Sequence, residues 1–79
     1  MDAKLTLHYD RDADILHISK RPPYPEQESE ELGDGVVARI NPATGEVENL
    51  EILFFSVRLR QGDAFDLPVA ADLKLAAGR

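Results

Sequence analysis

The chain has 79 residues, a formal net charge of -6 and no cysteine. A chain this short cannot divide its core between two units, so residues 1–79 are expected to form a single domain. Hydrophobic residues make up 43% and charged residues 30%, a composition typical of a folded globular protein rather than a disordered one. The excess of acid argues against nucleic-acid and anionic-lipid partners, and the lack of cysteine excludes disulfides and thiolate metal sites.

No apolar run approaches the roughly 18 residues that a membrane-spanning helix needs. The first residues lead directly into strand-like sequence, without the basic and apolar segments of an export signal. These features predict a cytoplasmic protein of bacterial type with no membrane partner.

Two runs of alternating apolar residues within residues 5–20 predict the first β-hairpin. The stretch DRDAD between them is rich in short carboxylates that accept hydrogen bonds from nearby backbone amides, so it is expected to form the turn. If Tyr9 faces Leu16, the apolar side chains share one face of the hairpin. His8 then lies directly opposite His17 on the other face.

An acidic run follows the first hairpin, after three prolines in residues 22–25 have ended the second strand. It places four carboxylates within six residues: Glu26, Glu28, Glu30 and Glu31. We interpret this run either as a solvated linker or exposed edge strand, or as an acidic docking surface for a basic protein partner.

A second hairpin is predicted from the β-branched residues 36–40 and the strand-like residues 47–55. In the last strand Leu50 and Ile52 lie on one face, but apolar residues also occupy the other, so both faces need cover. The C-terminal tail or a second copy of the chain would supply that cover. The candidate interface residues are Val47, Leu53, Phe54, Phe55, Val69 and Leu73.

The C-terminal segment, residues 66–77, has the composition of a short helix with Asp66 as its cap and Pro68 in its first turn. Such a helix is too short to persist alone in water, so it should dock onto the sheet. The sequence therefore predicts a mainly β (α+β) fold. Residues 4–55 form a four-stranded antiparallel meander of two hairpins, and a short C-terminal helix follows.

The pair His8 and His17 is the feature of the chain with metal-ligand character, because opposed residues on a hairpin have Cβ atoms about 5 Å apart. Further ligands would have to be carboxylates or residues of another chain. The alternative is a cross-strand polar pair without a metal. The spacing of the remaining serines, glycines and carboxylates matches no catalytic motif, so we expect no catalytic residue, no cofactor and no enzymatic activity.

Three segments of the chain together form a recognisable pattern: residues 9–18 (YDRDADILHI), 30–37 (EELGDGVV) and 45–53 (GEVENLEIL). They resemble the domain of unknown function 2283 family over about residues 4–56. The resemblance implies an antiparallel meander, and an occasional pairing with small toxin-like proteins that would make the chain antitoxin-like. The sequence departs from the family pattern at Asn49, where glycine is usual, and at Phe54 and Phe55.

These features together predict a small non-catalytic interaction module. We expect it to form a homodimer or larger homo-oligomer through its last strand and its C-terminal segment. The alternative is a domain that binds a small ligand or a metal ion through His8 and His17.

Overall fold

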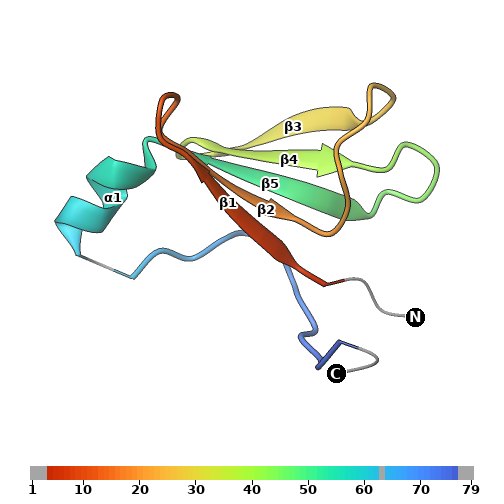
Figure 1. Cartoon of the computed structure of the whole chain (residues 1–79). Coiled ribbons are helices and arrows are strands. Elements are labelled where there is room, and N and C mark those ends of the chain that lie inside the picture. The colour runs from red at the N-terminus through yellow and green to blue at the C-terminus, as the bar shows by residue number, and fades with distance from the viewer. Residues whose placement is uncertain (1–3, 63, 77–79) are drawn as a thin grey trace.

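The computed structural model describes residues 4–62 and 64–76 and shows one antiparallel sheet followed by one short helix (Figure 1). The elements are β1 Thr6–Asp10, β2 Ile15–Ser19, β3 Glu28–Gly33, β4 Val36–Ile40, β5 Val47–Leu53 and α1 Phe55–Gln61. The expected mainly β architecture is confirmed. The sheet has five strands rather than four, because the acidic run supplies β3, which pairs with β4.

The strand order across the sheet is β1-β2-β5-β4-β3, so the predicted meander order is wrong. After β2 the chain passes through residues 20–27 to the far edge and returns through β4 to β5. The strand richest in buried residues, β5, lies at the centre of the sheet, and the glutamate-rich β3 lies at one edge. This placement buries apolar surface and leaves the acidic side chains in water.

The register of the first hairpin agrees with the sequence prediction. Tyr9 lies opposite Leu16, and His8 lies opposite His17. One row, apolar except for the glutamate at its end, therefore crosses the sheet in the order Leu7, Ile18, Leu50, Ala38 and Glu30. The row that starts at His8 lies on the opposite, polar face.

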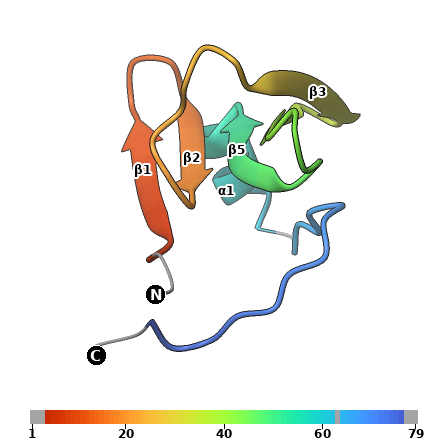
Figure 2. The ribbon, with the colours of Figure 1, turned by 90° about the vertical axis from the view of Figure 1, so that its right-hand side faces the viewer.

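The core lies on the apolar face of β4 and β5. Among the described residues, four apolar side chains are buried: Val36, Ala38, Leu50 and Ile52. The tail runs back beneath the sheet from α1 (Figures 1 and 2), and its side chains Leu67 and Val69 pack against this core. The tail thus covers the face that carries Leu50, rather than the second face of β5.

Val47 also belongs to this core, in contrast to its predicted place on the second face. The register between β4 and β5 shifts beside Arg39, so Val47 comes opposite Ile40. Such a bulge inserts an extra residue and reverses the alternation beyond it. The second face of β5 therefore carries mainly polar side chains and needs less cover than the sequence suggests.

The helix α1 begins at Phe55, directly after β5, and projects from the end of the sheet (Figure 1). The predicted helical segment, residues 66–77, is described as far as residue 76 and has no regular secondary structure there. The strand expected over residues 47–55 ends earlier, at Leu53, because the chain turns into α1 after it. Phe54 adopts a left-handed backbone conformation, with φ of 55°, which turns the chain from strand to helix.

Candidate functional site

The segments that carry the family-like pattern meet at the end of the sheet where α1 begins. The carboxylate of Asp14, in the turn between β1 and β2, accepts a hydrogen bond from the Ser56 amide at 2.9 Å and from the Ser56 hydroxyl at 2.7 Å. The Tyr9 hydroxyl donates to the same carboxylate at 2.6 Å. Asp14 therefore caps α1 across 42 residues of sequence, where Phe54 provides no side-chain cap.

These hydrogen bonds favour the ionised form of Asp14. The bond from Tyr9, followed by those from Ser56, lowers the pKa of the carboxyl, and the same contact raises the pKa of the Tyr9 hydroxyl. Tyr9 also packs against Phe55, with ring centres 5.8 Å apart. The cluster ties the turn between β1 and β2 to the first turn of α1 and holds the helix in place.

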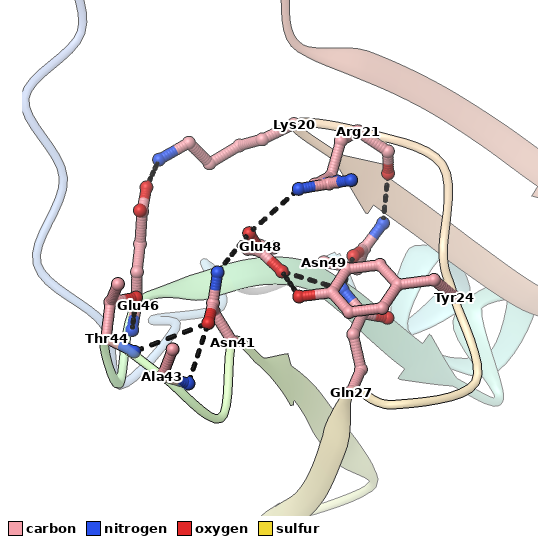
Figure 3. Close-up of polar contacts among 10 residues, drawn as sticks. All are labelled: Lys20, Arg21, Tyr24, Gln27, Asn41, Ala43, Thr44, Glu46, Glu48 and Asn49. Carbon is pink, nitrogen blue, oxygen red and sulfur yellow. Dashed lines mark hydrogen bonds and ion pairs between the residues drawn. The ribbon is translucent and has the colours of Figure 1, made fainter.

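A second carboxylate, Glu48, organises the opposite end of the sheet (Figure 3). Glu48 is 6% exposed, and its carboxylate accepts hydrogen bonds from Tyr24 at 2.6 Å, from Gln27 at 3.1 Å and from Asn41 at 3.2 Å. The guanidinium of Arg21 lies 3.7 Å away. The Tyr24 bond is the main cause that lowers the pKa of Glu48, and it raises the pKa of Tyr24.

Asn49 extends this network to the loop of residues 20–27. It accepts from Gln27 at 2.7 Å and donates to the carbonyl of Arg21 at 2.7 Å, while Lys20 pairs with Glu46 in the next turn (Figure 3). These hydrogen bonds hold the loop of residues 20–27, which leads from β2 to β3 at the far edge of the sheet. Asn49 therefore has a structural role at the position where the family pattern has glycine.

The polar face carries a shallow hollow of about 280 Å³ over β1, β2 and β5. The rings of His8 and His17 lie with their centres 6.1 Å apart. Glu51 lies on the other side of His17, with its carboxylate 3.7 Å from Nδ1, and Arg39 is 3.4 Å from the same carboxylate. The structure thus brings the predicted histidine pair together and adds Glu51 and Arg39, which the sequence reading missed.

A closed metal centre is absent from the described part of the chain. Within residues 4–62 and 64–76, no three His, Asp, Glu or Cys side chains are grouped so as to hold a metal ion. Among these residues of a single copy, the two histidines therefore have no third protein ligand.

The apolar face is left open over β1. Leu7 is 61% exposed and Leu5, just before the strand, is 49% exposed. Leu7 lies on the face of the core, but the tail packs over β4 and β5 instead. This exposed apolar edge, which we call the β1 strip, consists of Leu5 and Leu7 and was not among the predicted interface residues.

The six predicted interface residues do not form one surface. Val47 and Val69 pack in the core, and Leu53 and Phe55 are half-buried, with Phe55 against Tyr9. Phe54 and Leu73 are exposed. Most of these side chains therefore pack within one copy of the chain.

The acidic run is exposed, as both interpretations of it required. Glu28, Glu30 and Glu31 belong to the edge strand β3, and Glu26 lies in the loop before it. Glu30 ends the apolar row and Glu31 ends the polar row, so the carboxylates emerge on both faces of this edge.

The fold and its sites define a small antiparallel β-sheet domain with a helix anchored by a tertiary cap and two polar networks. Residues 6–56 match the family described as Protein of unknown function (DUF2283), and the chain belongs to this family. The match covers all five strands and the residues of the Asp14 cluster. Comparisons with curated proteins and with solved structures found no match. Among the described residues, no helix is long and apolar enough to cross a membrane.

Proposed function

We propose that this domain is a non-catalytic interaction module that self-associates by pairing strand β1 with β1 of a second copy. The observation that carries the proposal is the β1 strip, where Leu7 is 61% exposed on an edge strand. A single copy leaves this apolar surface in water beside a core of four buried apolar side chains among the described residues. Small cores of this kind commonly gain stability by association.

The two edges of the sheet differ in how well they resist pairing. An edge strand presents unpaired backbone groups, and charged side chains or bulges protect it against addition of another strand. β3 carries three glutamates and a register shift between Glu31 and Gly33. β1 has the sequence TLHYD, which is uncharged until Asp10. Pairing is therefore favoured at β1.

The charge distribution supports a second copy as the partner. Two chains of net charge -6 repel each other, so they must meet where the acidic side chains are few. The glutamates of β3 lie at the opposite edge from β1. A pair joined through β1 keeps the two acidic edges at the far ends of the combined sheet.

A two-fold symmetric pair would use the same β1 contact in both copies. An antiparallel pair of β1 strands related by a two-fold axis places the same patch of each copy against the other. Leu5 and Leu7 of both copies then lie on one face and cover each other. The acidic run stays free in this arrangement, and we propose it as the surface for a basic protein partner of an antitoxin-like module.

The β1 strip is tested by Leu7→Glu, with Leu59→Glu as the matched control. Leu59 is 64% exposed, as much as Leu7, but lies on α1. Because a charge at the centre of the interface is desolvated on pairing, Leu7→Glu should yield monomer while Leu59→Glu remains dimeric. Size-exclusion chromatography with light scattering measures both.

Amide hydrogen exchange separates strand pairing from side-chain packing alone. In an edge strand, alternate amides point toward the neighbouring strand and outward. If β1 pairs with β1, both kinds of amide in residues 6–10 should be protected, and the protection should decrease on dilution. Equal masses for the two glutamate variants, or unprotected outer amides in β1, would count against the proposal.

A further inference from the structure

The two histidines of the polar face are close enough to share one metal ion. A Zn–N bond is about 2.0–2.1 Å, so two imidazoles on one ion have ring centres at most about 6.4 Å apart. The centres of His8 and His17 are 6.1 Å apart, and the rings are inclined by 30°. The two rings therefore lie within the separation that a shared ion permits.

Glu51 selects the nitrogen that His17 would use. Its carboxylate lies 3.7 Å from Nδ1 of His17, on the side of β5. Nδ1 and Nε2 both bond Cε1 of the imidazole ring and face outward in diverging directions, and β1 with His8 flanks β2 on the side opposite β5. A carboxylate at one nitrogen of a histidine orients the ring and increases its basicity at the other, as in many zinc sites.

Arg39 keeps Glu51 in this outer position. Its guanidinium lies 3.4 Å from the carboxylate atom that faces His17. A carboxylate engaged by a guanidinium is neutralised and less available as a direct metal ligand. Glu51 therefore serves as the partner of a ligand rather than as a ligand itself.

We propose that His8 and His17 form an open, two-histidine site for an exchangeable divalent transition-metal ion of the zinc and copper class. The hollow around them leaves room for water at the remaining coordination positions. Both ligands come from one copy of the chain, so the site does not depend on self-association. Two protein ligands make it a weak, reversible site rather than a structural centre.

Zinc chloride is the probe for this site, added to untagged, full-length protein. Proton NMR should show the imidazole signals of both histidines shifting together as zinc is added, with saturation at one ion per chain. Isothermal titration calorimetry supplies the affinity. The NMR readout needs no variant and therefore stands even if a substitution disturbs the fold.

Three substitutions define the roles. His8→Ala and His17→Ala should each lower zinc affinity at least tenfold, because a single histidine remains. Glu51→Gln should lower it by roughly tenfold through the orientation of His17. Glu46→Gln, which removes a carboxylate in the turn between β4 and β5, should leave the affinity unchanged.

The proposal is overturned if zinc leaves the imidazole signals in place, or if the histidine variants bind zinc as tightly as the wild type. A loss of affinity in Glu46→Gln equal to that in Glu51→Gln would overturn the outer-shell role of Glu51. Failure of these tests leaves the molar mass of the protein unaffected, so it is distinguishable from failure of the β1 pairing.

Discussion

At the scale of single residues, Asp14 and Glu48 each join several parts of the fold. Each carboxylate accepts hydrogen bonds from segments distant in sequence: Asp14 holds Ser56, and Glu48 holds Tyr24 and Gln27. The sequence predicted Asp14 as a turn residue, and its φ of 58° agrees. Its capping of α1 could not be predicted, because it depends on which strand ends lie side by side.

Both carboxylates make stability depend on pH. Their folded-state pKa values lie below the ordinary values of 3.8 for Asp14 and 4.5 for Glu48. In the pH range between folded and ordinary values the unfolded chain binds more protons, so the free energy of unfolding rises with pH. The contribution is fully present above about pH 5.5 and is lost as the pH falls through the folded-state values. Urea midpoints at about pH 7 and pH 3 should show the loss.

Glu48→Gln removes one of the two titrations. The variant should be less stable than the wild type at neutral pH and should show a smaller difference between the two midpoints. A wild-type midpoint that is equal or higher at the acidic pH would contradict the assigned roles of these carboxylates.

At the scale of elements, local pattern predicted the first hairpin and its register, left the acidic run open between a linker and an exposed edge strand, and misplaced the helix. β3 has the sequence ESEELG, which lacks the apolar alternation of a strand and is held by pairing with β4. α1 contains aromatic and β-branched residues with modest helix propensity and is fixed by its tertiary cap. Residues 66–77 have better propensity, but a segment that short does not hold a helix alone.

The turn between β3 and β4 provides a test of packing against α1. Gly35 has φ of 74°, and a Cβ there would lie 3.3 Å from Nη2 of Arg58, whose guanidinium stacks on Phe65 at 4.0 Å. Gly45 has φ of 77° and open space around it, so it is the matched control. Gly45→Ala should cost about 1 kcal/mol for backbone strain. Gly35→Ala should cost roughly 0.5 kcal/mol more, because the guanidinium of Arg58 must shift by a few tenths of an ångström from its place on Phe65.

Chemical denaturation of both variants measures this difference. Equal losses of stability for Gly35→Ala and Gly45→Ala would mean that the Arg58 contact contributes nothing to the anchoring of α1.

At the scale of the whole molecule, the candidate sites depend on strand order. The histidine pair was predictable because one hairpin supplies both residues. Glu51 and Arg39 join it only because β2 neighbours β5, a crossover that no local pattern reveals. The exposure of Leu7 likewise follows from β1 being an edge strand while the tail covers β4 and β5.

Net charge should make self-association depend on salt. Each copy carries -6, so pairing brings like charges together even though the acidic edges stay apart. Added salt screens this repulsion, and the Debye length falls from about 30 Å at 0.01 M to about 8 Å at 0.15 M. The dimer dissociation constant, measured by dilution, should therefore decrease as salt is added. An increase would indicate that attraction between opposite charges holds the copies together.

The proposed pairing of β1 between two copies is tested by the molar mass of the untagged wild-type protein in solution. Light scattering at low and high protein concentration should approach twice the chain mass of 8.8 kDa as concentration rises. A well-folded protein that stays at the mass of one chain throughout would contradict the claim and would mean that the β1 strip is stable in water or serves a different partner.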